Sequence, residues 1–226
     1  MGKRFVLGDI HGAGKALTDC LEFSGFDNNN DQLICLGDVC DGWPDVRSSI
    51  DQLLNIKNLI YIMGNHDEWA CQWMKDNEIN DVWLPQGGYA TMKSYQKGIP
   101  QEHIDFLARA HDYFVMENKL FVHGGILPDI PLSEQGRSVF LWDRSLLEKA
   151  MNRKDGQITE FDEVYLGHTP TLKMNSTKPL KFSEIRMIDT GAGWNGGKLT
   201  IMDIDSKEYW QSQPVQTYYP GVKGRG

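Results

Sequence analysis

Short hydrophobic runs alternate with amphipathic stretches along the first third of the chain. A cluster of glycine and polar residues follows each run, which is typical of a buried strand that ends at a turn. Between the runs, apolar residues recur at helical spacing, for example Val46, Ile50 and Leu53. The order indicates a βαβαβ unit with parallel strands and crossover helices. The pattern predicts strands at 4–7, 32–36 and 59–63, helices at 13–23 and 45–56, and a further helical stretch through Trp69 and Trp73.

The second half of the chain returns to predicted strands after a more helical middle at about 80–112. Hydrophobic runs lie at 113–123, 164–168, 185–189 and 198–204, and glycine-containing turns such as WNGG separate them. This close spacing favours hairpins in a second, more mixed sheet.

Polar motifs end five of the predicted strands. Ligands of open α/β sheets bind beyond the carboxyl ends of the strands, so we expect these motifs to lie together. Four of the six histidines occur in them, whereas His103 and His111 lie in the helical middle and are expected to be structural. The motifs are GDIHG (8–12), GDVCDG (37–42), GNHD (64–67), VHGG (122–125) and GHTP (167–170).

The side chains of these motifs are typical of a metal site. Carboxylate, imidazole and amide oxygen without thiolate suit manganese, iron or zinc. Two such ions about 3.5 to 4 Å apart can clamp a phosphoryl group and activate a water between them. Asp38 is the expected bridge, because a carboxylate offers two oxygens and its motif is central in the order.

Composition and charge exclude several classes of protein. The 226 residues, 40% of them hydrophobic, suit one domain with a sizeable core. No apolar run approaches the roughly 18 residues that cross a bilayer, and the first is too short for a signal peptide. We therefore expect a cytoplasmic protein without a membrane partner. The net charge of −8, with no basic tract, argues against nucleic acid as a partner, and bound cations would be needed to attract a phosphate.

Residues 1–210 are predicted to form the catalytic domain and residues 211–226 a C-terminal extension. The extension, QSQPVQTYYPGVKGRG, contains repeated proline and glycine and is interpreted as a surface extension, with a functional arm as the alternative. The four cysteines have no CxxC spacing and are expected to be reduced, buried thiols.

As an ordered set, the five motifs resemble the calcineurin-like metallophosphoesterase superfamily. Within it, the chain is similar to the phosphoprotein phosphatases, in particular to the bacterial and bacteriophage lambda-type serine/threonine phosphatases. GGYATMKSY (87–95) and IDTGAGWNGGKLTIMDID (188–205) extend the resemblance over most of the chain. It implies an α/β fold in which two mixed β-sheets pack as a sandwich flanked by helices, the metallophosphoesterase fold.

The resemblance also implies roles for the motif residues. His66 would protonate the leaving oxygen, and Asp41 would orient His66. Manganese is the expected metal, with iron or zinc as alternatives. One ion would be held by Asp9, His11 and Asp38, and the second by Asp38, Asn65, His123 and His168.

Two departures from the family pattern bear on the substrate. The pattern usually has arginine directly after the second aspartate and directly before GNH, where this chain has Gly42 and Met63. Such arginines grip phosphate oxygens in bidentate fashion. Arg144, in LWDRS, matches a Trp-x-Arg pattern of lambda-type relatives and is the expected phosphate-binding arginine, together with Asn65. Arg47 and Arg137 are further candidates.

The expected function is that of a dinuclear metal-dependent phosphatase. Its expected substrates are phosphomonoesters, with phosphoserine or phosphothreonine in proteins as the family default and phosphotyrosine or a small phosphate ester also open. Pro170 replaces a further metal-binding histidine of related nucleases, which favours phosphoprotein phosphatases and diadenosine polyphosphate hydrolases. A diadenosine polyphosphate hydrolase is therefore the first alternative and a catalytically silent binding module the second. Trp43 or Trp194 could form an aromatic wall beside the metals, with core packing as the other interpretation.

Overall fold

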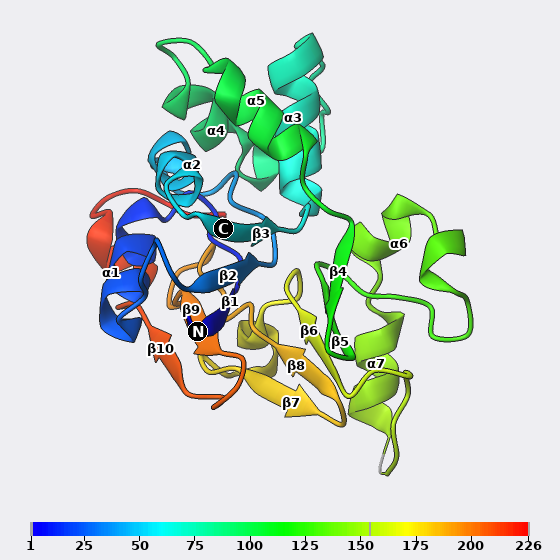
Figure 1. Cartoon of the computed structure of the whole chain (residues 1–226). Helices are drawn as coiled ribbons and strands as arrows, with labels where there is room; N and C mark the ends of the chain where they lie inside the picture. Colours follow the sequence, from blue (N-terminus) through cyan, green and yellow to red (C-terminus); the bar gives the residue numbers. More distant parts are fainter. Residues whose placement is uncertain (1, 154, 226) are drawn as a thin grey trace.

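The computed structural model describes residues 2–153 and 155–225. In that part of the chain, the strands form two mixed sheets of five strands each, and helices lie outside them (Figure 1). The first sheet contains β1 (Arg4–Leu7), β2 (Gln32–Cys35), β3 (Asn58–Tyr61), β9 (Thr200–Asp203) and β10 (Tyr209–Gln211), in the order β10-β9-β1-β2-β3. The second contains β4 (Tyr113–Met116), β5 (Lys119–Val122), β6 (Glu163–Leu166), β7 (Leu180–Phe182) and β8 (Ile185–Met187), in the order β4-β5-β6-β8-β7.

The helices divide between the two sheets. Those of the first sheet are α1 (Gly14–Ser24), α2 (Val46–Leu54), α3 (Asn65–Asp76), α4 (Gly88–Ser94) and α5 (Gln101–Ala108). Beside the second sheet lie α6 (Arg137–Trp142) and α7 (Ser145–Asn152) (Figure 1). Four short 3₁₀ helices complete the described elements: η1 (Leu84–Gln86), η2 (Leu132–Glu134), η3 (Thr171–Met174) and η4 (Val215–Tyr218).

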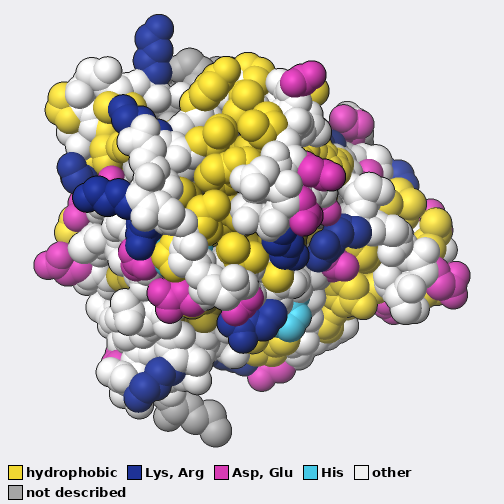
Figure 2. All heavy atoms as spheres, turned by 90° about the horizontal axis from the view of Figure 1, so that it is seen from above, with side chains coloured by type: hydrophobic (Ala, Val, Ile, Leu, Met, Phe, Trp, Pro, Cys, Tyr) yellow, Lys and Arg dark blue, Asp and Glu magenta, His cyan; other side chains and the backbone are white. Residues whose placement is uncertain are grey.

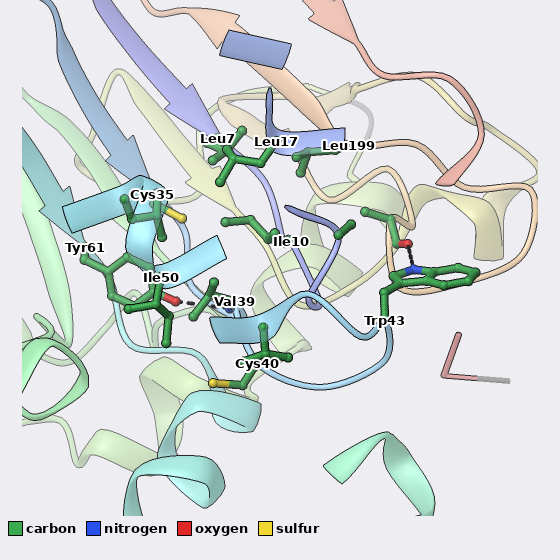
Figure 3. Close-up of a cluster of buried hydrophobic side chains, with 14 of the residues drawn as sticks. Leu7, Ile10, Leu17, Cys35, Val39, Cys40, Trp43, Ile50, Tyr61 and Leu199 are labelled. Atoms are coloured by element: carbon green, nitrogen blue, oxygen red, sulfur yellow. Dashed lines mark hydrogen bonds between the residues drawn. The ribbon is translucent and has the colours of Figure 1, made fainter. Parts of the chain in front are cut away.

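The alternation of side chains along β1 explains how the layers pack. Phe5 and Leu7 point to the helical side, where Leu7 lies in the cluster that also contains Leu17 of α1 (Figure 3). Val6 points the opposite way, into a cluster shared with Phe121 and Tyr165 of the second sheet. Successive residues of a strand face opposite sides, so one buried strand contributes to both interfaces. The sheets are thus joined by apolar packing.

Most predicted elements are found within a few residues of their expected bounds, but one strand was placed in the wrong sheet. We expected the run at 198–204 in the second sheet, following a hairpin after 185–189. Instead β9 pairs antiparallel with β1 of the first sheet. The chain crosses from one sheet to the other between Met187 and Thr200. This crossing segment passes the loop after β1, since a Cβ atom at Gly193 would lie 2.6 Å from His11 Cδ2.

The C-terminal segment differs from the expected surface extension. Val215 and Tyr219 are buried in the cluster of the first sheet and its helices, although neighbouring residues of the segment are exposed. The Tyr219 ring stacks on the Trp43 ring with 5.4 Å between centroids. The division of the chain at residue 210 stays a prediction, but this segment packs on the first sheet and its helices.

The described surface mixes charged and apolar groups. Lys and Arg side chains lie among hydrophobic ones on the face seen in Figure 2, although the net charge is −8. Val82 and Tyr89, in the region between α3 and α5, are among the exposed large hydrophobic residues. Over the described residues, every helix is too short or too polar to span a lipid bilayer.

Candidate active site

The loops after β1, β2, β3, β5 and β6 bring the predicted side chains together. β1, β2 and β3 are parallel to one another, and β5 is parallel to β6. The carboxyl ends therefore lie at one edge within each sheet, and the hydrogen bond from His168 N to Asp9 Oδ2, at 3.0 Å, shows that the two edges meet. The six predicted metal ligands, which are Asp9, His11, Asp38, Asn65, His123 and His168, are all buried there.

Asp9, His11 and Asp38 form the first half of the cluster. The Nε2 atom of His11 lies 4.0 Å from Asp9 Oδ2 and 3.7 Å from Asp38 Oδ2. One ligand atom from each of the three residues lies within 4.8 Å of the others, which allows one ion to contact all three. His11 Nδ1 lies 3.0 Å from the Cys40 carbonyl oxygen, which can only accept. That hydrogen bond leaves the Nε2 lone pair for an ion.

Asp38, Asn65, His123 and His168 form the second half. Asp38 Oδ2 is 3.4 Å from His123 Nε2, and Asn65 Oδ1 lies 3.0 Å from His123 Nε2 and 2.8 Å from His168 Nδ1. His123 Nδ1 donates to the Leu36 carbonyl oxygen at 2.7 Å, so its Nε2 faces the cluster. Asp38 thus lies between the two halves.

The buried carboxylates of this cluster favour a positively charged group or ion beside them. Burial alone would lower the pKa of His123, but the Asp38 carboxylate outweighs it and raises this pKa to about 10. Burial raises the pKa of Asp9, and the charge of Asp189 raises it further. Buried carboxylates that lack compensating charge are costly, and bound cations would compensate them.

Two atoms of the cluster test whether the residues fit a metal. Among the described residues, Asp9 Oδ1 and His168 Nε2 are buried without a hydrogen-bond partner. Buried polar atoms are nearly always paired, so such atoms call for an explanation such as an ion. Carboxylate, imidazole and amide oxygen are also suitable ligands for divalent transition metals. The residues therefore fit a divalent metal centre.

Close backbone approach explains the glycines of the motifs. A Cβ atom at Gly64 would lie 2.1 Å from Asp38 Oδ1, and one at Gly167 would lie 2.4 Å from Asp9 Oδ1. Four polar residues of the cluster have left-handed backbones, a conformation that costs a residue other than glycine roughly 1–3 kcal/mol. They are His11, Asp38, Asp41 and His168, with φ of 50°, 51°, 72° and 63°.

His66 and Asp41 form a buried pair beside the metal ligands. His66 Nδ1 lies 2.6 Å from Asp41 Oδ2. Asp41 Oδ2 also accepts from Trp83 Nε1 at 2.7 Å, and Asp41 Oδ1 accepts from Thr91 Oγ1 at 2.6 Å. An ionised carboxylate only accepts hydrogen bonds, so His66 Nδ1 is the donor. This arrangement leaves His66 Nε2 as the free ring nitrogen.

A pocket of about 190 Å³ adjoins the pair and the ligands. Arg144 lines it, whereas Arg137 pairs with Asp112 and Arg47 donates to the Gly98 carbonyl oxygen. Trp194 lines the pocket, but Trp43 is buried and donates from Nε1 to the Ala192 carbonyl oxygen (Figure 3). The complete lining is Asn65, His66, Gln86, Trp142, Arg144, His168, Pro170, Lys173, Trp194 and Arg225.

Sequence reasoning missed several residues that build this site. Asp67 accepts hydrogen bonds from Tyr61 Oη and from the backbone nitrogens of Asp38, Cys40 and Gly64, and so ties two of the motif loops together. Its position in GNHD was a signal that could have been used. Thr91 lies in GGYATMKSY, but Trp83 and Arg225 lie outside the motifs and carried no such signal.

Comparisons with known proteins agree with this geometry. Residues 3–188 match the family model described as calcineurin-like phosphoesterase. A serine/threonine-protein phosphatase 1 from Salmonella typhimurium is 28% identical over 208 residues, covering 88% of this chain and 91% of that protein. An asymmetrical bis(5′-nucleosyl)-tetraphosphatase from Oceanobacillus iheyensis is 24% identical over 230 residues, covering 90% of this chain and 89% of that protein.

Solved structures show the same fold. The crystal structure of a proposed diadenosine tetraphosphatase aligns with this chain with a TM-score of 0.69 and 17% sequence identity. The alignment covers 93% of this chain and 92% of that one. The family match extends over most of the chain and includes the loops that form the cluster. The chain belongs to the calcineurin-like phosphoesterase family, whose activity is the hydrolysis of phosphate esters.

Proposed function

We propose that this protein is a dinuclear metal-dependent phosphatase that hydrolyses phosphomonoesters, with phosphoserine and phosphothreonine in proteins as its substrates. The observation that carries this proposal is the position of His66. Its Nδ1 donates to Asp41, and its ring lines the same pocket as Asn65 and His168 of the metal cluster. A proton donor beside metal ligands is what cleavage of a phosphate ester requires.

The ligand sets follow the two halves of the cluster. Asp9, His11 and Asp38 would hold one ion, and Asp38 would share the second with Asn65, His123 and His168. When bound, the ions would generate a nucleophile from water and offset the charge of the phosphate. Manganese is the metal we propose, with iron or zinc compatible with the same ligands.

The remaining residues would act directly on the substrate. Asn65 and Arg144 would hold the phosphate oxygens, since both line the pocket. His66, protonated at Nε2, would give that proton to the leaving oxygen. Asp41 would keep the ring oriented and stabilise its positive charge, as a carboxylate does for a catalytic imidazole.

A second candidate is a diadenosine polyphosphate hydrolase with the same metal ligands. A mostly apolar hollow of about 250 Å³ adjoins the pocket and is lined by Pro170, Leu172, Lys173 and Trp194. Trp194 offers a surface on which an adenine ring could stack. The similarity to a bis(5′-nucleosyl)-tetraphosphatase also favours this candidate.

A substrate panel separates the two candidates. The protein loaded with Mn²⁺ is assayed on p-nitrophenyl phosphate, on phosphoserine, phosphothreonine and phosphotyrosine peptides, and on diadenosine tetraphosphate. The proposal predicts release of phosphate from the monoester and from the phosphoserine and phosphothreonine peptides. Turnover of diadenosine tetraphosphate alone would establish the second candidate. Metal binding without turnover on any ester would support a silent binding module.

A further inference from the structure

The C-terminal segment returns to the mouth of the candidate active site. After η4, the stacked Tyr219 ring fixes it against Trp43, and Tyr219 Oη donates to Asp45 Oδ2 at 2.7 Å. Arg225 then becomes part of the pocket lining.

Several contacts hold Arg225 in this position. Its backbone nitrogen donates to the Gly193 carbonyl oxygen at 2.8 Å, and its Nε donates to the Gln86 carbonyl oxygen at 3.2 Å. The guanidinium carbon lies 5.1 Å from the Trp194 ring centroid, within the range of a cation–π interaction. Nη1 lies 3.0 Å from His11 Nε2, so the guanidinium reaches the metal cluster.

Two glycines make room for the Arg225 side chain. A Cβ atom at Gly42 would lie 3.1 Å from Arg225 Cγ, and one at Gly193 would lie 3.0 Å from Arg225 Cδ. Gly42 has a φ of 87°, which other residues rarely adopt. Position 42 is also where the resemblance leads us to expect an arginine. The stem of Arg225 therefore lies next to the backbone from which that arginine would project.

The pocket concentrates positive charge that an anion would balance. Arg144, Lys173 and Arg225 line the same small space. Burial lowers the pKa of Arg144, and the charge of Arg225 lowers it further. Guanidinium groups bind phosphate oxygens through paired, charge-assisted hydrogen bonds.

We propose that Arg225 binds the phosphate oxygens of the substrate and so takes the place of the arginine absent at position 42. When His11 ligates an ion, its Nε2 lone pair no longer accepts from Arg225. The Nη1 donor then becomes available to a phosphate oxygen. The inference rests on the proposed function, because it assigns Arg225 to the substrate of that same site.

The test compares three variants of the full chain loaded with Mn²⁺. Arg225→Ala removes the guanidinium, Arg225→Lys keeps the charge without the bidentate geometry, and Lys223→Ala is the matched control for an exposed charge of the same segment. The measurements are kcat and KM on p-nitrophenyl phosphate, calorimetric affinity for inorganic phosphate, and manganese content. Millimolar guanidinium chloride is then added to test for chemical rescue.

We expect Arg225→Ala to weaken phosphate binding and raise KM by about tenfold or more, which is the loss of one charge-assisted contact. The phosphate affinity and KM of Arg225→Lys should lie between those of wild type and Arg225→Ala, and those of Lys223→Ala should match wild type. Added guanidinium should restore part of the phosphate affinity that Arg225→Ala loses. Unchanged phosphate affinity in Arg225→Ala would overturn the inference, as would increased activity, which would show that the segment obstructs the pocket. If wild type hydrolyses no ester, the proposed function fails, and phosphate affinity still decides the role of Arg225.

Discussion

Asp41 Oδ2 lies 2.6 Å from His66 Nδ1, and both side chains are buried. Trp83 and Thr91 supply further hydrogen bonds to the same carboxylate, so Asp41 is fixed on both oxygens. The pair can therefore hold one orientation of the imidazole, with Nε2 free.

Asp41→Asn tests this relationship. The amide keeps the shape of the carboxylate but lowers its ability to stabilise a protonated imidazole. We expect kcat on p-nitrophenyl phosphate to fall by about 10²-fold or more, with manganese content unchanged. Thr91→Val, which removes both hydrogen bonds between the Thr91 hydroxyl and Asp41 but keeps the carboxylate charge, should reduce kcat much less. Wild-type kcat in Asp41→Asn would show that the pair has no catalytic role.

Asp9→Asn should have opposite effects on stability with and without metal. Burial raises the pKa of Asp9, as does the charge of Asp189, so the ionised form is unfavourable in the folded protein. For an acid whose pKa is raised on folding, stability falls as pH rises above the unfolded pKa of about 3.9. At pH 7 with a chelator, we expect the variant to melt about 2–4 °C higher than wild type.

Added Mn²⁺ should reverse the order of the two melting temperatures. Wild type should be stabilised strongly because the ion offsets the buried carboxylates, whereas the variant lacks one ligand. Thermal melts at pH 7 and pH 4.5 provide the comparison, and the metal-free difference should shrink at the lower pH. If Asp9→Asn melted below wild type at pH 7 in the presence of a chelator, the assignment of Asp9 as an uncompensated carboxylate would be contradicted.

Glu163→Gln tests an ion network away from the site. Burial raises the pKa of Glu163, but hydrogen bonds from Lys207, Arg186 and Tyr165 outweigh it, so the net pKa is lowered. A lowered acid pKa contributes stability above the unfolded pKa of about 4.3, which is lost as pH falls through the folded pKa. We expect the variant to lose about 1 kcal/mol of unfolding free energy at pH 7.

Urea titrations from pH 3 to pH 7 measure that loss. The difference between wild type and Glu163→Gln should vanish at the acid end, and Glu22→Gln, an exposed residue of α1, should show no comparable trend. A difference that is constant over this pH range would mean that the carboxylate charge contributes nothing.

Much of the fold could be predicted from local pattern. β1, β2 and β3 are short hydrophobic runs directly before glycine-rich turns, and parallel strands bring their carboxyl ends to one edge. That rule brings together Asp9, Asp38 and Asn65, whereas the contact of Asp9 with His168, 159 positions away, also requires the second sheet to pack on the first. The predicted sheet for β9 was wrong. All four residues of β9 are buried, so its burial pattern is compatible with either sheet.

The supporting contacts of the site depend on tertiary packing. Thr91 is 50 residues from Asp41, and Arg225 is 214 residues from His11. No local period in the sequence relates such residues. A segment with repeated proline and glycine is typical of an exposed tail, and its sequence does not show that its aromatic residues pack into the core. The position of Arg225 in the pocket therefore could not be predicted from the pattern of the sequence.

The most direct test of the central claim is the kcat of His66→Asn on p-nitrophenyl phosphate, with bound manganese quantified in the same sample. His111→Asn, a change at an exposed histidine, is the matched control and should behave as wild type. We predict that His66→Asn loses about 10²- to 10⁴-fold in kcat while retaining two manganese ions per chain. Undiminished turnover in His66→Asn, or activity lost together with the metal, would contradict the assignment of His66 as the proton donor.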